Sequence, residues 1–506
     1  MRASTLEIPI GSTAPLSCGQ LAAFATNIGA KAVWTLAAKE RIAASYENFV
    51  RHREDGIPIY GTTTGFGPHV VSDTGGEEAQ GASLIAHLGA GFGPDAPGSV
   101  VRAAMLLRLH TVGQGFSGVR PEAAMAYLGL LNAGVAPCVP ETGSVGASGD
   151  LVPLSYIARV LMGSGEAVYE ENRLPASVCL RLAKLPPTEL TGRDALALVN
   201  GTSFLTAYAA IATARTARLI CYAETLTGWL YRLLGCRTDA VSRALHRARG
   251  QDGQIGSARR IRSEVNRFGE VEDASRPLQE VYSLRCAPQV LGACRDSLQH
   301  TRTIVEREID GIDDNPVIFA DAVLHGGNFH GQAVGFAADI LNAALTQIAV
   351  LAERQIALLC TPSRHNDFAP LLLAFEPGRD SGLAGAQLTA TALLAEMRGA
   401  CQQYATSSIP TNADNQDVVP MATLAAQSAY RQTERLAGVL AVLHIAACQL
   451  TFLRGEGRAV GRTSAPPPGF PAFEPLQTDR ALYSNIRRIA DLFLNGETEQ
   501  DATESE

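Results

Sequence analysis

Residues 339–359 read DILNAALTQIAVLAERQIALL, and their apolar side chains recur at every third or fourth position. This spacing places the apolar side chains on one face of a long α-helix. Similar patterns occupy residues 202–236, 284–309, 383–400 and 420–453. Long helices rich in alanine pack closely against one another. The sequence therefore predicts a mainly α fold built around a long central helical bundle.

The character of the sequence changes along the chain and predicts three parts. Residues 1–140 combine short helical patterns with turns rich in glycine and proline, and clear strand alternation is rare. We expect a smaller mixed N-terminal domain over residues 1–195 and a long helical bundle domain over residues 196–494. The final segment, 495–506, is acidic and polar, which predicts a disordered tail.

The composition of the chain argues against several classes of partner. The 506 residues carry a net charge of −8 and contain no cluster of five basic residues. This argues against nucleic acid or an acidic membrane surface as a partner. The uncharged run Leu436–Leu453 is long enough to cross a bilayer. Because it contains His444, Gln449 and Thr451, we interpret it as a buried core helix rather than a membrane span.

The cysteine pattern and the N-terminus indicate a cellular compartment. The ten cysteines are scattered and form no CxxC pair. The sequence thus lacks zinc-binding spacing, and a chain of this length does not need disulfides. The N-terminus lacks the basic and then apolar segments of a secretory signal. We therefore expect a cytoplasmic protein with reduced thiols and no metal site.

Residues 143–152 read GSVGASGDLV and are nearly free of bulky side chains, although apolar segments flank them on both sides. Glycine is unfavourable inside a helix. A tight turn that starts the next helix would explain the stretch, with Pro153 in the first helical turn. A second interpretation is a serine nucleophile at Ser148. Asp150, however, occupies the place of the glycine that ends a G-x-S-x-G elbow.

A third interpretation uses the small side chains for chemistry. Without bulk, the backbone nitrogen of Gly149 can approach the carbonyl carbon of Ala147 and close a five-membered ring. Loss of water from the ring and from the Ser148 side chain then leaves a carbon–carbon double bond conjugated to an imidazolone. Ordinary side chains supply nucleophiles, acids and bases but no strong electrophile. This ring would supply one.

GSVGASGDLVPLS resembles the signature of the aromatic amino acid ammonia-lyases and aminomutases, whose electrophile is 4-methylidene-imidazol-5-one (MIO). The resemblance extends over about residues 55–455 and includes YGTTTGFG (60–67), ALVNGTS (197–203), YSLRCAPQVLGA (282–293), DDNPVI (313–318), LHGGNFHGQ (324–332) and NADNQDVV (412–419). It implies the helical fold of histidine and phenylalanine ammonia-lyases. It also implies MIO formed autocatalytically from Ala147, Ser148 and Gly149, with no external cofactor, and a homotetramer whose active sites are shared between subunits.

The resemblance also implies roles for other residues. Tyr60, in a glycine-rich loop that fits a lid, would remove the β-proton with a phenol of depressed pKa; ring packing is the alternative. Arg285 would bind the substrate carboxylate, unless it forms a structural ion pair. Tyr282, one turn earlier, would face the same side, and Asn200 would hydrogen-bond the ring carbonyl. The substrate pocket would further include Gly67, Gln279, Asn328, Phe329, Asn415 and Gln416.

Two motifs bear on which aromatic amino acid binds. His87 and Leu88 match the His-Leu pair of tyrosine ammonia-lyases, and a histidine there could hydrogen-bond the substrate phenol; alternatively, His87 satisfies a local backbone group. Gln416 also resembles the tyrosine enzymes, whereas His330 and SSIPT (407–411) resemble histidine ammonia-lyases. We expect an L-tyrosine ammonia-lyase that gives 4-coumarate and ammonia. A tyrosine or other aromatic 2,3-aminomutase, a histidine ammonia-lyase and a non-catalytic scaffold are the alternatives.

Overall fold

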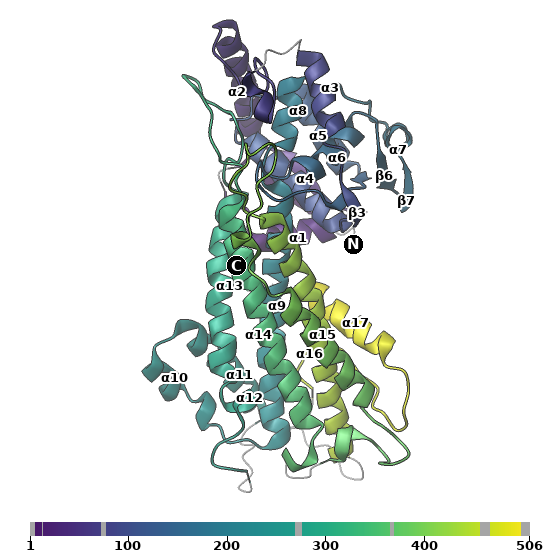
Figure 1. The fold of residues 1–506 in the computed structure, drawn as a ribbon. Helices are drawn as coiled ribbons and strands as arrows, with labels where there is room; N and C mark the ends of the chain where they lie inside the picture. Colours follow the sequence, from purple (N-terminus) through teal and green to yellow (C-terminus); the bar gives the residue numbers. More distant parts are fainter. Residues whose placement is uncertain are drawn as a thin grey trace. The chain divides into compact units, whose positions relative to one another are not determined.

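The computed structural model describes residues 6–12, 14–71, 77–268, 276–364, 369–455 and 466–496. Residues 497–506 of the expected acidic tail lie outside this range. Helices dominate the described chain (Figure 1), which confirms the predicted fold class. The chain forms two compact units, and each is made of separate segments. Unit 1 comprises Met1–Ile211, Arg302–Asp339 and Gln403–Gln427, and unit 2 comprises Ala212–Thr301, Ile340–Gln402 and Ser428–Glu506.

Unit 1 combines short helices with very short strands. Its helices are α1 (Cys18–Thr26), α2 (Leu36–Glu54), η1 (Gly67–Val71), α3 (Glu77–His87), α4 (Gly98–Gly113), α5 (Pro121–Asn132), α6 (Leu151–Leu161), α7 (Ala176–Leu182), α8 (Gly192–Val199) and η6 (Tyr404–Thr406). Its strands are β1 (Glu7–Ile10), β2 (Lys31–Trp34), β3 (Phe92–Asp95), β4 (Ala136–Pro137), β5 (Pro140–Thr142), β6 (Glu166–Tyr169), β7 (Asn172–Pro175), β8 (Val317–Ile318) and β9 (Val323–Leu324).

The strands of unit 1 form four small sheets. β1 and β2 pair in parallel, with Ile8 opposite Ala32. β3 pairs with β5, β8 with β9, and β6 lies between β4 and β7, all antiparallel. Strands of two to four residues give little periodic signal, which explains why the sequence shows so little strand alternation.

Three helices of unit 1 position the segments around the glycine-rich stretch. α4 is buried along nearly its whole length. α8 begins with a capping box formed by Thr191 and Asp194, and Asn200 is its C-cap residue. α6 begins directly after Asp150, with Pro153 in its first turn, because proline is well tolerated where a helix starts.

The long predicted helices are present. They are α9 (Ser203–Leu234), α13 (Ala287–Ile309), α14 (Gln332–Leu359), α15 (Ala384–Ala400) and α16 (Ala422–Gly455). The predicted range 284–309 is interrupted, however. A separate turn, α12 (Tyr282–Arg285), ends at Cys286, whose backbone leaves the helical region before α13 begins.

Unit 2 contains a bundle made from parts of these helices (Figure 1). Buried polar contacts join its members, since Gln355 of α14 donates a hydrogen bond to Thr227 of α9 at 3.0 Å. Arg295 of α13 contacts Glu224 of α9 at 2.6 Å. The remaining elements of the unit are η2 (Asp239–Val241), α10 (Arg243–Arg249), α11 (Asp252–Val265), η3 (Asn266–Phe268), η4 (Pro362–Arg364), η5 (Leu371–Leu373) and α17 (Tyr483–Asn495).

Two helices, α14 and α16, are long and apolar enough to cross a membrane by length and composition alone. The most apolar 18-residue windows of these helices are, however, 67% and 89% buried within the structure. Burial by neighbouring protein is typical of a core helix. It therefore supports the core-helix interpretation of Leu436–Leu453, which lies within α16.

Candidate active site

The stretch Ala147–Gly149 lies against the turn that follows α8. Gly149 and Gly201 form a parallel backbone bridge, and the N–H of Asp150 donates to the Gly201 carbonyl at 2.7 Å. Gly149 has a φ of +64°, a conformation that favours glycine. A Cβ atom on Gly149 would also collide with the Gly201 backbone. The absence of side chains here thus lets two backbone segments approach each other closely.

Two side-chain amides hold the two oxygens of Ser148. The Asn200 Nδ2 atom donates to the Ser148 carbonyl oxygen at 2.9 Å, and the Gln416 Nε2 atom donates to Ser148 Oγ at 2.6 Å. The Oδ1 atom of Asn200 is buried and has no hydrogen-bond partner within the described chain. Next to Ser148, the side chain of Ala147 is buried against Val419 and Met421. The structure therefore brings together five of the predicted residues.

Asp150 is a further site residue that the sequence analysis did not assign. Its buried carboxylate accepts hydrogen bonds from Ser144 at 2.7 Å, from Thr423 at 2.9 Å and from the backbone N–H of Leu205 at 2.7 Å. Burial raises the pKa of Asp150 to about 6, although these hydrogen bonds act in the opposite direction. The signal in the sequence was that Asp150 is a single carboxylate between small and apolar residues. If such a group is buried, it needs hydrogen-bond partners.

Tyr60 is held at both ends by its own loop and by His325. Its phenol oxygen accepts the N–H of Gly67 at 2.7 Å, and its ring lies edge-on to Phe66. Its backbone N–H donates to the Nε2 atom of His325 at 3.1 Å, so this imidazole is neutral, with its proton on Nδ1. Burial, and secondarily Arg193, lowers the pKa of His325, which favours the neutral form.

The structure corrects the expected pKa of Tyr60. We predicted a depressed value, but burial raises the pKa of the phenol above its ordinary value, and the Gly67 N–H offsets only part of this effect. Burial disfavours the charged phenolate. Sequence patterns carry no information on the degree of burial of a loop side chain, which explains the error.

His87 lies at the end of α3, and its Nδ1 atom contacts the carbonyl oxygen of Ser83 at 3.1 Å. A carbonyl oxygen only accepts hydrogen bonds, so Nδ1 carries a proton, and Nε2 accepts a hydrogen bond when it carries none. The alternative contact with a local backbone group is therefore present. In the neutral form, it leaves the exposed ring with an acceptor nitrogen. Leu88, the next residue, is buried.

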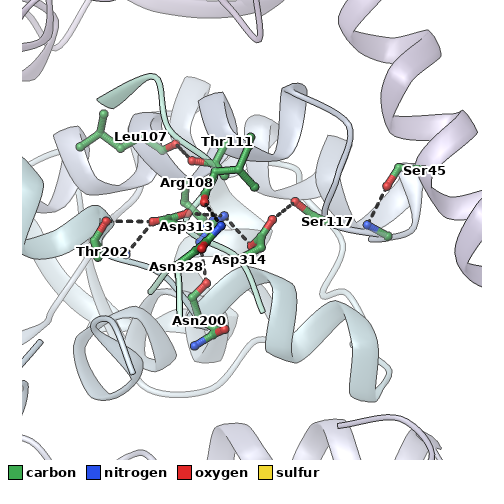
Figure 2. Close-up of polar contacts among 12 residues, drawn as sticks. Ser45, Leu107, Arg108, Thr111, Ser117, Asn200, Thr202, Asp313, Asp314 and Asn328 are labelled. Atoms are coloured by element: carbon green, nitrogen blue, oxygen red, sulfur yellow. Dashed lines mark hydrogen bonds and ion pairs between the residues drawn. The ribbon is translucent and has the colours of Figure 1, made fainter. Parts of the chain in front are cut away.

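The remaining predicted residues of unit 1 lie in turns. Asn328 is exposed, and its side chain donates to the Ile312 carbonyl at 3.1 Å. It lies beside the buried ion pairs of Arg108 in Figure 2. Phe329 is half-buried, and Asn415 is exposed in the turn closed by Thr411 and Gln416.

Three predicted residues belong to unit 2. Tyr282 and Arg285 lie on the same side of α12, and the guanidinium carbon of Arg285 is 4.5 Å from the centre of the Tyr282 ring. The Nε atom of Arg285 is buried without a hydrogen-bond partner within the described chain. Tyr282 is 69% exposed, and Gln279 is exposed as well. Among the described residues, no carboxylate contacts Arg285.

A family model for aromatic amino acid lyases matches residues 16–466. The chain belongs to the aromatic amino acid lyase family. This lyase is 38% identical to a tyrosine ammonia-lyase of Cupriavidus metallidurans, over 83% of this chain and 85% of that protein. It is 36% identical to a histidine ammonia-lyase of Caldanaerobacter subterraneus, over 92% of each. A crystal structure of a tyrosine aminomutase from Streptomyces globisporus matches with a TM-score of 0.87 and 32% identity, over 98% of this chain and 99% of that chain.

Proposed function

We propose that this lyase is an L-tyrosine ammonia-lyase that forms 4-coumarate and ammonia. The observation that carries the proposal is the pair of amide hydrogen bonds on Ser148, from Asn200 at 2.9 Å and from Gln416 at 2.6 Å. Both donors hold the middle residue of a tripeptide whose small side chains permit ring closure. Gln416 also bears on substrate selection, because it resembles the residue of the tyrosine enzymes.

The residues of the tripeptide fit the MIO group. Ring closure joins the Gly149 nitrogen to the Ala147 carbonyl carbon, whose oxygen leaves as water with the hydrogens of the Gly149 and Ser148 nitrogens. The Ser148 hydroxyl leaves as a second water with the hydrogen of its own Cα. The Ser148 carbonyl then becomes the ring carbonyl, and Asn200 already donates to this oxygen. When formed, the ring supplies an electrophilic carbon that makes the substrate amine a better leaving group.

Tyr60 is the proposed base for the β-proton of the substrate. Its hydroxyl oxygen accepts the Gly67 N–H. This donor would stabilise the phenolate that removes the proton. Because burial raises the pKa of this phenol, its action as a base requires stabilisation of the phenolate beyond that given by the Gly67 N–H. The glycine-rich loop of Tyr60 and Gly67 would also exclude water.

Arg285 is the proposed residue that binds the substrate carboxylate. Tyr282 and Gln279 would contact the substrate as well. The Arg285 guanidinium lies over the Tyr282 ring. A planar guanidinium binds a carboxylate through two parallel hydrogen bonds. We propose a homotetramer in which these residues, together with Asn328, Phe329 and Asn415, complete active sites shared between subunits.

His87 is the residue proposed to recognise the hydroxyl of the substrate tyrosine by a hydrogen bond. Since Ser83 fixes the proton on Nδ1, Nε2 would accept the hydrogen bond of the substrate phenol, with Leu88 beneath the ring. Phenylalanine would leave this acceptor unpaired, which a binding site penalises.

The ten cysteines carry free thiols. This supports a cytoplasmic protein, because the cytoplasm is a reducing compartment.

One comparison favours a second candidate for the reaction, and another favours a second candidate for the substrate. Similarity to the tyrosine aminomutase structure favours a 2,3-aminomutase that returns the amine to the β-carbon. Similarity to histidine ammonia-lyases, together with His330, favours histidine as the substrate. Incubation with tyrosine, phenylalanine and histidine, with identification of acrylates, β-amino acids and free ammonia, separates the three. Equal or faster turnover of histidine, or a β-amino acid as the main product, would overturn the proposal.

A further inference from the structure

Arg108 is a completely buried cation in the middle of α4. A buried charge is costly unless it is paired and hydrogen-bonded. Here two neighbouring carboxylates pair with it, since the Nη2 atom of Arg108 lies 2.8 Å from Oδ1 of Asp314 and 3.1 Å from Oδ1 of Asp313. Figure 2 shows that these groups converge on one point beside Asn200.

Arg108 and Asp313 both hold the turn that follows α8. The Nη1 atom of Arg108 donates to the Asn200 carbonyl oxygen at 2.7 Å. Asp313 accepts the backbone N–H of Thr202 at 2.6 Å and also its hydroxyl at 3.1 Å. The residue between these two contacts is Gly201, and a Cβ atom on it would collide with the guanidinium of Arg108 and the carboxylate of Asp313.

The same turn also holds the tripeptide. Gly201 accepts the N–H of Asp150 and bridges to Gly149, while the side chain of Asn200 reaches the Ser148 carbonyl. The Arg108 ion pairs and residues 148–150 therefore contact the same three-residue turn. Any displacement of this turn would move the Gly149 nitrogen relative to the Ala147 carbonyl carbon.

We propose that Arg108, together with Asp313 and Asp314, is a positioning residue for the self-cyclisation of Ala147, Ser148 and Gly149. The ion pairs fix the Asn200–Thr202 turn, and the turn presses the tripeptide backbone into the geometry that closes the ring. Ser117 supports the arrangement by donating to Asp314 at 2.6 Å. This inference rests on the proposed function, because it concerns formation of the MIO group.

The test measures ring formation directly. Full-length Arg108→Lys protein keeps the charge but loses the forked contact with Asn200 and the aspartates. Arg102→Lys is the matched control, since Arg102 is a buried arginine of the same helix that donates to the carbonyls of Phe24 and Leu131. Each protein is synthesised in a cell-free system, and intact mass is followed with time for loss of two waters, alongside its melting temperature.

We expect water loss from Arg108→Lys to be about 10- to 100-fold slower than from wild type, because small misplacements of reacting groups cost this much. Arg102→Lys should lose both waters at the wild-type rate. If Arg108→Lys does not fold, Asp313→Asn tests the same point, as its amide oxygen still accepts the Thr202 N–H. Wild-type rates in the folded variants would overturn the inference alone. A wild-type chain that keeps both waters would overturn the proposed function together with it.

Discussion

Asn200 donates its side-chain N–H to the carbonyl oxygen of Ser148 at 2.9 Å. This contact places a fixed donor where negative charge would collect on the ring carbonyl. Removing one such donor from an active site costs about 10²- to 10³-fold in kcat. We therefore expect this loss in Asn200→Ala, measured by steady-state kinetics, with intact mass reporting the extent of ring formation. Activity within about twofold of wild type would show that the donor is not used.

Tyr60→Phe removes the hydroxyl that accepts the Gly67 N–H and leaves the ring in contact with Phe66. If Tyr60 is the base, kcat should fall by about 10²- to 10⁴-fold, while the intact mass still shows the loss of two waters. Tyr46→Phe, in α2, is the matched control and should retain activity. Wild-type turnover in Tyr60→Phe would assign the base to another residue.

His87→Phe tests the origin of substrate selectivity. The variant removes the acceptor Nε2 that the contact with Ser83 leaves available. We expect the ratio of kcat/KM for tyrosine to that for phenylalanine to fall at least about 100-fold. His87→Gln keeps an acceptor at this position and should lose less selectivity. An unchanged ratio in His87→Phe would mean that the phenol is recognised elsewhere.

Glu308 gives the chain a pH-dependent stability. Burial, with a smaller effect of Asp313, raises the pKa of Glu308 to about 7, while a hydrogen bond from Thr202 at 2.5 Å acts in the other direction. The folded chain thus holds this proton more tightly than the unfolded chain. Its contribution to the free energy of unfolding therefore decreases as pH rises from the ordinary value of 4.5 to about 7.

Glu308→Gln isolates this effect, because glutamine accepts the Thr202 hydroxyl but does not ionise. We expect equal melting temperatures for variant and wild type near pH 4, below the ordinary pKa of 4.5. At pH 8 the variant should be more stable than wild type by about 1 to 3 kcal/mol. Thermal unfolding at both pH values provides the comparison. A variant that is less stable at pH 8 would mean that the ionised carboxylate is favourable in the fold.

The sequence predicts the helices of this protein well because one apolar face repeats over many turns. The range 202–236 corresponds to α9, and 420–453 corresponds to α16. The break at Cys286 was missed, although Pro288 near the start of α13 signals a helix beginning. The composition of the compact units is harder to predict. Unit 1 gathers three distant segments, and local periodicity does not report which segments pack together.

The site was predictable where function constrains a motif and unpredictable where partners come from distant segments. Asn200 and Gln416 were assigned from motifs, and both contact Ser148. The pairing of Arg108 with Asp313 joins residues about two hundred positions apart, which no local pattern reports. The two arginines in the apolar run of α4 were nevertheless a signal that buried partners exist.

The contact between Gly149 and Gly201 has a consequence for protein engineering. The reactive group of this enzyme would arise from residues 147–149, which a second main-chain segment approaches without any intervening side chain. Transplanting such a reagent into an unrelated scaffold therefore requires copying this close approach of two backbone segments, with its spacing intact. Grafting the three residues alone would transfer the sequence motif but not the backbone packing that brings the reacting atoms together.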